Sequence, residues 1–579
     1  MVRYRNLIEA LEAAPGERPF VTFWVNEDEQ ETVTFAEFRR RARLQAGLLK
    51  THGINAGDRV VAIMPQGIPA MTVFAGAMML GAAPALIAYP NDKVEPSKYR
   101  SGLAGVTANL KAKLVVIDHE FPDDMLSHVS LPDESRLLRA VDGRGPGGDE
   151  ALSDLKNQAL MSPDPTGQAD RIAFIQHSAG TTGLQKGVAL THEAVLRQLA
   201  HLVGTLMIGG AMIDGTTDRV YSWLPLYHDM GLIACFMLPM VYHIPVVMQS
   251  PLDWVMHPET MLQVITEHRC TLAWLPNFAF QFVPRRTRPN RRSQYNLSSV
   301  RALINCSEPV RADSMQEFHN AFAASGLKDG VLQSCYAMAE NVFAVTQSDI
   351  QRSSGPTHIW ADGRQFRSSH QVIPVAEGTP GSVPFTSSGG LLSNHEIRIV
   401  SESGTLLADG QVGEILVKSD CLFDGYYNRP DLTAKVIVHG WYQTGDLGFT
   451  LEGELYVVGR MKDLIIIGGE NIYPQDIEEI AASHPAIRDG RVIAMGMYNP
   501  DLGTEEIVMV AEVEREESLA NALEIEREIR GRVAAGLGVT AGMIFLKPPK
   551  WLVKSTAGKA ARSTTLEKLQ KEHPELNFS

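Results

Sequence analysis

The chain has 579 residues, of which 44% are hydrophobic and 21% are charged, and its formal net charge at pH 7 is −14. This composition is typical of a folded globular protein with several domains and excludes general disorder. The acidic balance argues against a nucleic-acid partner, because sequence-independent binding needs a basic surface. The five cysteines are scattered without a C-x-x-C pair, which favours neither a disulfide framework nor a zinc site and fits the cytoplasm, the location we expect.

Helical and β-rich patterns alternate along the first part of the chain. The first eleven residues alternate charged and apolar side chains, as an amphipathic helix does, and lack the apolar core of a signal peptide. A helical periodicity covers residues 35–52 and 68–80, and short β-rich runs cover residues 59–64 and 114–117. Such alternation favours an α/β fold in which helices cover a largely parallel sheet.

The longest apolar stretch, residues 73–89, bears on membrane insertion. It contains Gly76, Gly81 and Pro84, and it is shorter than the about 20 apolar residues that a bilayer-spanning helix needs. We therefore expect a buried helix, a turn and a strand here, and no stable membrane insertion. Residues 142–148, which are rich in Gly and Asp, are expected to form a surface loop.

A second pattern begins after residue 460 and predicts a compact α+β unit. Its expected strands are residues 463–467, 492–497, 507–513 and 543–546, and its expected helices are residues 475–484 and 519–534. About 120 residues is within the usual range of an independent domain. The predicted fold class is therefore α/β, with a large N-terminal α/β domain of several subdomains (residues 1–460) and a small C-terminal α+β domain (residues 461–579).

A loop rich in glycine and hydroxyl side chains, S-A-G-T-T-G-L-Q-K-G at residues 178–187, follows the apolar run 172–175. Its glycines let backbone N–H groups approach an anion, its hydroxyls donate hydrogen bonds, and Lys186 supplies positive charge, so the loop can cradle phosphate. It is not a Walker A loop, because Gln185 stands where a glycine must precede the lysine. The alternative is an ordinary surface loop.

Four further motifs follow in the order Y-A-M-A-E (336–340), Y-Q-T-G-D (442–446), G-R-M-K-D (459–463) and S-T-A-G-K (555–559). In this order and spacing, the five motifs resemble the ATP-dependent acyl-adenylate-forming superfamily. That superfamily includes acyl-CoA synthetases, fatty acyl-AMP ligases, peptide-synthetase adenylation domains and luciferases. The resemblance covers nearly the whole chain, and it implies the adenylate-forming enzyme fold with a mobile C-terminal domain and a hinge at Lys462.

Adenylation needs a site for the triphosphate. A carboxylate attacks the α-phosphorus of ATP and expels pyrophosphate, so negative charge must be spread over the phosphate oxygens. The resemblance implies that Glu340, together with Thr182, holds Mg²⁺, which takes carboxylate, phosphate and water oxygens. The loop residues expected to bind ATP are Ser178, Gly180, Thr181, Thr182, Gly183 and Lys186.

The resemblance also assigns residues to the nucleoside part of ATP. Asp446 is expected to accept hydrogen bonds from the ribose hydroxyls, with Arg460 beside it. The segment N-C-S-E-P at residues 305–309 resembles the strand end that binds adenine. The residues expected around the base are Ser307, Glu308 and Pro309, with Tyr336 stacked on it. The alternative is that these are packing residues.

Two residues are assigned to the reaction itself. Lys559 lies on a Ser/Thr/Gly loop near the C-terminus, and the resemblance implies that it enters the site and neutralises charge as the α-phosphate and the carboxylate react. His228 lies in W-L-P-L-Y-H-D-M-G at residues 223–231 and is expected to steer the carboxylate, with the apolar run 232–242 lining an acyl tunnel. The alternative for His228 is a hydrogen-bonded core histidine.

Fatty acyl-AMP ligases are the subfamily that the chain resembles in particular, through residues 224–231, 250–253, 276–280, 307–310, 463–467 and 473–478. These ligases pass the acyl group to the phosphopantetheine of an acyl carrier protein rather than to CoA. The segment between Glu340 and Gly389 is long enough for the insertion typical of that subfamily. One departure is G-G-E-N at residues 468–471, a sequence that is common among CoA ligases. In those ligases the pantetheine arm of CoA passes close to this backbone, so the resemblance implies that Gly468 and Gly469 lie on the path of the acceptor. Another departure is Trp274, where a small residue is usual and which would shorten the acyl pocket.

Three functions therefore stay open. The chain is expected to activate a fatty or other carboxylic acid with ATP and Mg²⁺ and to load an acyl carrier protein supplied in trans. The alternatives are an acyl-CoA ligase and a degenerate adenylate-binding protein, and the last is disfavoured because Glu340, Asp446, Arg460 and Lys559 are all present. The basic run at residues 285–292 is either a solvated loop or a docking patch for an acidic carrier protein.

Overall fold

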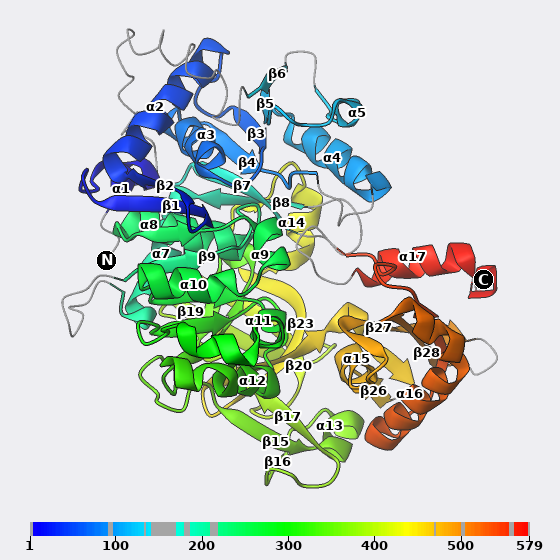
Figure 1. Cartoon of the computed structure of the whole chain (residues 1–579). Coiled ribbons are helices and arrows are strands. Elements are labelled where there is room, and N and C mark those ends of the chain that lie inside the picture. Colours follow the sequence, from blue (N-terminus) through cyan, green and yellow to red (C-terminus); the bar gives the residue numbers. More distant parts are fainter. Residues whose placement is uncertain are drawn as a thin grey trace.

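The computed structural model describes residues 4–90, 96–131, 135–140, 169–178, 186–208, 218–467, 470–499, 504–554 and 561–576. A large N-terminal body carries a smaller C-terminal unit at its side, orange and red in Figure 1. The α/β class predicted from the sequence is thus observed. Within the described ranges, no helix combines the length and the apolar character that crossing a membrane requires. The predicted surface loop at residues 142–148 lies outside the described residues.

A nine-stranded sheet forms the centre of the large body, in the order β18-β14-β13-β12-β11-β9-β10-β1-β2. The pairs from β13 to β1 are parallel, and the outer pairs are antiparallel. The central strands are short and buried on both faces, as expected when helices cover a parallel sheet. The nine strands are β18 Gly390–Leu391, β14 Ala344–Gln347, β13 Leu332–Ala337, β12 Ala302–Asn305, β11 Leu272–Leu275, β9 Val220–Ser222, β10 Val246–Met248, β1 Pro19–Asn26 and β2 Glu29–Thr34.

A second, all-parallel sheet has the order β4-β3-β5-β6, and it contains the predicted strands at 59–64 and 114–117. Its strands are β4 Ala83–Leu86, β3 Arg59–Ile63, β5 Leu114–Ile117 and β6 Arg136–Arg139. The predicted helices at 35–52 and 68–80 are α2 Phe35–Thr51 and α3 Ile68–Met79. The apolar stretch 73–89 thus runs from α3 through a turn into β4, as predicted.

Close packing of α3 on α2 depends on one glycine. A Cβ atom on Gly76 would lie 2.7 Å from the carbonyl oxygen of Ala42 and 2.9 Å from the backbone nitrogen of Ala46. Because α3 is buried almost all round, its neighbours have no free space to yield. A side chain at residue 76 would therefore force the two helices apart.

Antiparallel sheets, which the alternating pattern did not predict, bring the later motifs to the centre. One has the order β21-β8-β7, another has the order β19-β20-β23-β22 with β24 paired to β23, and a small one has the order β16-β15-β17. The small sheet and α13 lie between Glu340 and Gly389, where an insertion was expected. The strands are β7 Ile172–Ser178, β8 Lys186–Thr191, β21 Gly425–Tyr426, β19 His395–Val400, β20 Gly413–Ser419, β23 Trp441–Leu451, β22 Ile437–Val438, β24 Glu454–Arg460, β15 His358–Asp362, β16 Pro374–Val375 and β17 Ser382–Thr386.

Helices cover these sheets, as Figure 1 shows for α7 to α12 in green. The α-helices of the large body besides α2 and α3 are α1 Leu7–Glu12, α4 Pro96–Leu110, α5 Asp123–Leu126, α7 His192–Leu206, α8 Leu238–Tyr242, α9 Pro251–Met256, α10 Thr260–His268, α11 Asn277–Arg286, α12 Ala312–Phe322, α13 Gly363–Ser369 and α14 Pro430–Val436. The described part of this body also has a π-helix and three 3-10 turns: η1 Met230–Met237, η2 Pro289–Gln294, η3 Ala323–Ser325 and η4 Ala339–Asn341. The 3-10 turn η5 Met461–Asp463 leads into the C-terminal unit.

The C-terminal unit has a core of its own, built around Ile477, Ile507 and Val533. Its elements are β25 Ile465–Ile467, β26 Glu470–Ile472, α15 Pro474–Ala482, β27 Ile487–Asn499, β28 Thr504–Val513, η6 Glu516–Asn521, α16 Ala522–Leu537, β29 Ala541–Lys547, α17 Arg562–Glu572 and η7 Pro574–Leu576. All six elements predicted here exist. The helix predicted from residue 519 starts at Ala522 because Leu519 lies in the preceding 3-10 turn. The boundary at residues 460/461 stays a prediction.

Candidate functional site

The predicted ribose-binding residues form a hydrogen-bonded group. The Tyr336 hydroxyl donates to Asp446 Oδ2 over 2.6 Å, and Arg460 Nε lies 3.3 Å from Asp446 Oδ1. Asp446 and Arg460 face each other because they are paired residues on the antiparallel strands β23 and β24. Burial, and then the Asp446 charge, raises the pKa of Tyr336, so the phenol remains a hydrogen-bond donor. The Asp446 charge likewise raises the pKa of Arg460.

A second group surrounds the predicted metal ligand. The Tyr426 hydroxyl donates to Glu340 Oε1 over 2.7 Å, and Lys186 Nζ lies 4.6 Å from the centroid of the Tyr426 ring. Tyr426 pairs with Val188 in the β21–β8 ladder, which places it beside the first residue of β8. Burial, and then the Glu340 charge, raises the pKa of Tyr426. Sequence reasoning missed Tyr426, because no local pattern connects residue 426 with residue 340.

Tyr442 joins these two groups. It is buried, and its ring lies 5.7 Å from that of Phe423, measured between centroids. Burial raises its pKa most, and the charges of Glu340 and Asp446 raise it further. Phe423 also packs on Tyr426, with ring centroids 5.0 Å apart, and Tyr442 lies on β23 together with Asp446. The two groups therefore adjoin in one polar site. The sequence placed Tyr442 at the start of a motif but gave it no role.

The turn after β12 carries the predicted adenine-binding residues. Ser307 has a φ of +72°, a left-handed conformation that is uncommon for residues other than glycine. Its neighbour Glu308 accepts a 3.0 Å hydrogen bond from the backbone N–H of Phe278 through Oε2. Because β12 is parallel to β13, this turn and the Tyr336 motif leave the sheet at the same edge. Pro309 follows in the same turn.

Asn277 holds the base of that turn. Asn305 Nδ2 donates to Asn277 Oδ1 over 2.8 Å, and Asn277 Nδ2 donates to Ser314 Oγ over 3.1 Å. The backbone N–H of Arg311 also donates to Asn277 Oδ1, over 3.2 Å. All three side chains of this network are buried, so the network stabilises the strand end through bonds that water does not weaken.

His228 lies at the entrance to a buried apolar helix. Its Nδ1 lies 2.6 Å from Asp229 Oδ1, and Asp229 Oδ1 also accepts a 2.8 Å hydrogen bond from the N–H of Met230, the first residue of η1. A Cβ atom on Gly231 would lie 2.4 Å from the carbonyl oxygen of Pro225, so this tight turn needs glycine. The His228 side chain is 21% exposed, whereas every residue of η1 is buried. His228 is therefore a partly accessible imidazole rather than a fully buried core residue.

Comparison with known proteins decides the family. The AMP-binding enzyme family matches residues 8–427, more than half of the chain. The chain belongs to the AMP-binding enzyme family. Enzymes of this family use ATP, and the enzymatic class expected from the sequence, an adenylate-forming ligase, is confirmed.

Related proteins align along almost their whole length. A putative ligase of Mycobacterium tuberculosis is 27% identical over 538 residues, which span 92% of this chain and 94% of that protein. A 4-hydroxyphenylalkanoate adenylyltransferase of Mycobacterium marinum is 28% identical over 581 residues, covering 96% of this chain and 88% of that protein. A long-chain-fatty-acid–AMP ligase of Mycobacterium marinum is 27% identical over 569 residues, covering 94% and 92%.

Solved structures agree on the fold of this AMP-binding enzyme. One from a study of fatty acyl-adenylate ligases of E. coli and L. pneumophila has a TM-score of 0.87 at 26% identity and covers 99% of both chains. The L. pneumophila fatty acyl-adenylate ligase in complex with acyl adenylate and pyrophosphate has a TM-score of 0.70 at 26% identity and covers 98% of this chain and 96% of that one. The predicted arrangement of a large N-terminal and a small C-terminal domain is therefore confirmed.

Several predicted site residues of the enzyme lie outside the described residues, namely Gly180, Thr181, Thr182, Gly183, Gly468, Gly469 and Lys559, and the side chain of Ser178 is likewise not described. Their roles stay predictions. The strands on either side of the predicted phosphate loop are described: β7 ends at Ser178, and β8 begins at Lys186. The loop therefore connects two antiparallel strands next to Tyr426.

His177 is a buried residue beside that loop which sequence reasoning missed. Neither ring nitrogen has a hydrogen-bond partner among the described residues, and Nε2 would lie 3.3 Å from a Cβ atom on Gly187. Burial lowers the pKa of His177 to about 4, so the imidazole is neutral at pH 7. The sequence offers only a weak signal, because His177 belongs to the polar end, Q-H-S, of a strand that begins with apolar residues.

Aromatic and ionic contacts connect the two domains of the enzyme. The ring of Tyr473 stacks on Phe366 with centroids 5.2 Å apart, and Arg311 donates to the carbonyl oxygen of Gln475 over 3.3 Å. Ion pairs join Arg311 to Glu479 and Arg285 to Asp489. Lys462, the predicted hinge residue, is exposed in the turn η5 between the domains. Its role as a hinge stays a prediction.

Proposed function

We propose that this enzyme activates a fatty acid with ATP to an acyl-AMP and transfers the acyl group to the phosphopantetheine thiol of an acyl carrier protein. The observation that carries the proposal is that Tyr336 and Glu340, which belong to one short motif, are hydrogen-bonded to Asp446 and Tyr426 respectively, so the two groups adjoin in one site. A site with a phosphate-side carboxylate and a ribose-side carboxylate suits ATP along its length. The names of the related fatty acid–AMP ligase and fatty acyl-adenylate ligases support the substrate class.

The enzyme's own residues divide the work between the two ends of ATP. Asp446, held by Tyr336 and Arg460, would accept hydrogen bonds from the ribose hydroxyls, and the turn at Ser307 would receive adenine. Lys186 and the loop before it would hold the β- and γ-phosphates, and Lys559 would neutralise charge on the reacting α-phosphate. His228 would orient the incoming carboxylate.

The chemistry of Glu340 fits a hard divalent cation. Tyr426 occupies Oε1, whereas Oε2 accepts no hydrogen bond from the described part of the chain. A carboxylate oxygen free for coordination is the donor that Mg²⁺ prefers beside phosphate oxygens. Mg²⁺ bound here would screen the charge of the triphosphate, and Thr182 would be a second ligand. Tyr426 would orient the carboxylate in the way that outer-sphere hydrogen bonds orient metal ligands.

An acceptor assay tests the proposal. The enzyme is incubated with ATP, Mg²⁺ and radiolabelled fatty acids, first alone to measure carboxylate-dependent pyrophosphate exchange, and then with CoA or with a panel of holo acyl carrier proteins. We expect exchange with fatty acids and label on a carrier protein at a kcat/KM at least about tenfold above that for CoA. If no fatty acid supports pyrophosphate exchange, fatty acids are not the substrates of this enzyme.

A CoA ligase is the second candidate, because Gly468 and Gly469 leave space at the expected pantetheine path. Acyl-CoA formation as fast as carrier loading would favour it. In that case adenylation is retained and only the acceptor changes, so the two results are distinguishable.

A further inference from the structure

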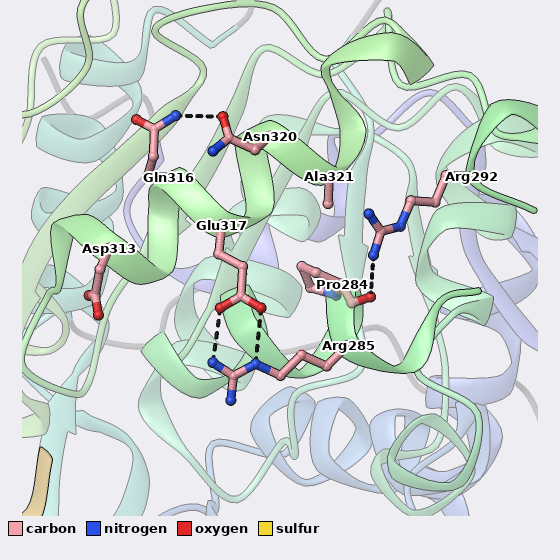
Figure 2. A pocket seen from close by; sticks show the side chains of 8 residues that line it. All are labelled: Pro284, Arg285, Arg292, Asp313, Gln316, Glu317, Asn320 and Ala321. Atoms are coloured by element: carbon pink, nitrogen blue, oxygen red, sulfur yellow. Dashed lines mark hydrogen bonds and ion pairs between the residues drawn. The ribbon is translucent and has the colours of Figure 1, made fainter. Parts of the chain in front are cut away.

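The basic run on α11 and η2 contains two kinds of arginine. Arg285 donates to both oxygens of Glu317 over 2.9 Å, and Arg292 donates to the carbonyl oxygen of Pro284 over 2.8 Å. Figure 2 shows these two arginines on the wall of a hollow of about 590 Å³ between α11 and α12. Both guanidinium groups are therefore already used within the protein.

The other three arginines of the run have no such partners. Arg286, Arg288 and Arg291 are exposed, and none forms an ion pair with any residue of the described ranges. Exposed arginines elsewhere, such as Arg40 and Arg429, do pair with neighbouring acids. Within the part of the chain that the structure describes, these three guanidinium groups thus have no ion-pair partner, although the whole chain has a net charge of −14.

Apolar side chains continue this charged patch toward α9. The guanidinium of Arg286 lies 5.3 Å from the centroid of the Phe282 ring, which in turn lies 6.2 Å from Phe278. Phe278 is 39% exposed, and Met256 at the end of α9 is 72% exposed. Trp254, buried beneath, contacts both phenylalanines with centroids 5.8 and 6.1 Å away and fixes α9 against α11.

We call this feature the arginine–aromatic surface, formed by Met256, Phe278, Phe282, Arg286, Arg288 and Arg291. Arginine, aromatic residues and methionine are the types enriched at protein–protein interfaces. Arginine also binds carboxylates in a planar, two-bond geometry that lysine cannot reproduce. The surface thus suits a partner that combines carboxylates with an apolar side chain.

The arginine–aromatic surface borders the active site and the C-terminal domain. The backbone N–H of Phe278 donates to Glu308, in the turn expected to receive adenine. Arg285, adjacent to Arg286, forms an ion pair with Asp489 of the C-terminal domain. A protein docked here would therefore lie beside the strand ends where the acyl-adenylate would form, at the junction of the two domains.

We propose that the arginine–aromatic surface docks the acyl carrier protein, by receiving a helix that presents carboxylates around an apolar side chain. This inference rests on the proposed function, because it presupposes a carrier protein as acceptor. The charges favour a compact acidic protein over an anionic membrane. Asp253 and Asp313 are exposed on the neighbouring helices α9 and α12, and the whole chain is strongly acidic, so a wide anionic surface would be repelled around the patch.

Charge reversal tests the docking. The variant carries Arg286→Glu, Arg288→Glu and Arg291→Glu. The matched control carries the same charge change at exposed arginines elsewhere that form no ion pair within the described ranges: Arg136→Glu, Arg364→Glu and Arg527→Glu. The acceptor is the holo carrier protein that the parent acylates fastest. We expect KM for that carrier to be at least about tenfold higher in the variant, because like charges now face each other. The rise of this KM with salt concentration should be smaller in the variant than in the parent, because the attraction that salt screens has been removed. KM for free pantetheine and the rate of pyrophosphate exchange should equal those of the parent.

A second variant tests the apolar half without touching the arginines. Met256→Asp places a carboxylate at an exposed position, so the fold should tolerate it, and KM for the carrier should again rise while KM for free pantetheine does not. An unchanged KM for the carrier in both variants would overturn the docking site while leaving carrier loading intact. Sedimentation with phosphatidylglycerol vesicles tests whether the surface binds an anionic membrane instead. If the parent binds the vesicles, the charge reversal abolishes that binding and KM for the carrier is unchanged, the surface binds a membrane rather than the carrier. If the parent acylates no carrier, the proposed function fails, and this inference fails with it.

Discussion

Tyr336 and Asp446 lie 110 residues apart in the sequence, and the tyrosine hydroxyl donates a 2.6 Å hydrogen bond to the carboxylate. Tyr336 lies near the end of β13 in the central sheet, and Asp446 lies in β23 of an antiparallel sheet. The bond therefore holds two layers of the protein together at the proposed nucleoside site. Because burial raises the pKa of the phenol above its ordinary value, the hydroxyl keeps its proton at neutral pH and donates this hydrogen bond.

Removing this hydrogen bond should weaken ATP binding. Tyr336→Phe keeps the ring but leaves Asp446 without its phenolic donor, and a hydrogen bond to a charged group contributes about 1.5–3 kcal/mol. We expect KM for ATP in pyrophosphate exchange to rise by roughly tenfold or more, with a smaller change in kcat. Tyr498→Phe, which alters a tyrosine that is 61% exposed, is the control and should behave like the parent. Equal KM values for the two variants would mean that Asp446 is positioned without Tyr336.

Neutralising Glu340 should change the need for Mg²⁺. Glu340→Gln preserves shape and the hydrogen bond from Tyr426 but removes the charge that would bind the cation. We expect the Mg²⁺ concentration for half-maximal pyrophosphate exchange to increase several-fold. Glu396→Gln, at a side chain 64% exposed, should leave the titration unchanged. If the Glu340→Gln titration overlays that of the parent, Glu340 is structural and the metal binds elsewhere.

Lys559→Ala should separate the two half-reactions. Loss of one preorganised charge donor costs about 2.7–4 kcal/mol of transition-state stabilisation, so adenylation should slow by roughly 10² to 10³. Transfer from a preformed acyl-adenylate should continue, because no pyrophosphate leaves in that step. The measurements are fatty-acid-dependent pyrophosphate exchange and single-turnover transfer, with Lys571→Ala as the control at an exposed lysine of α17. Undiminished exchange in Lys559→Ala would contradict the assignment.

Two buried histidines should make folding stability depend on pH. Burial lowers the pKa of His177 and of His192 to about 4, and His192 Nδ1 accepts a hydrogen bond from the N–H of Leu7, which requires an unprotonated nitrogen. Between pH 6.5 and 4 the unfolded chain binds more protons than the folded one, so stability is fully present above pH 6.5 and is lost as pH falls toward 4. The linkage amounts to roughly 3 kcal/mol for each histidine.

Urea unfolding followed across this range checks the sign and the size. His177→Asn or His192→Asn should flatten the fall in free energy of unfolding between pH 6.5 and 4, whereas His257→Asn, at an exposed histidine, should not. A parent whose stability is constant over that range would show that these imidazoles are protonated in the folded state.

Local sequence patterns were sufficient to predict the α/β class, several elements of both domains and the superfamily. Local apolar patterns predict helix α3 and strands β3 and β5. All six elements predicted in the C-terminal domain are observed, with bounds that differ by a few residues from the predicted ones. The five motifs resemble the adenylate-forming superfamily in their order and spacing, and the match to the AMP-binding enzyme family confirms that resemblance. Motifs of this kind consist of a few consecutive residues, so they can be recognised without knowing the tertiary contacts of those residues.

Contacts between side chains that are distant in the sequence could not be predicted and depend on the folded structure. Tyr426 reaches Glu340 because β21 pairs with β8, and Asp446 faces Arg460 because β23 pairs with β24 in an antiparallel sheet that the alternating pattern did not predict. The same holds for the unpaired arginines, since the sequence shows five basic residues but not which of them already have partners. Strand pairing and burial depend on how the whole chain packs, so they cannot be predicted from any single segment of the sequence.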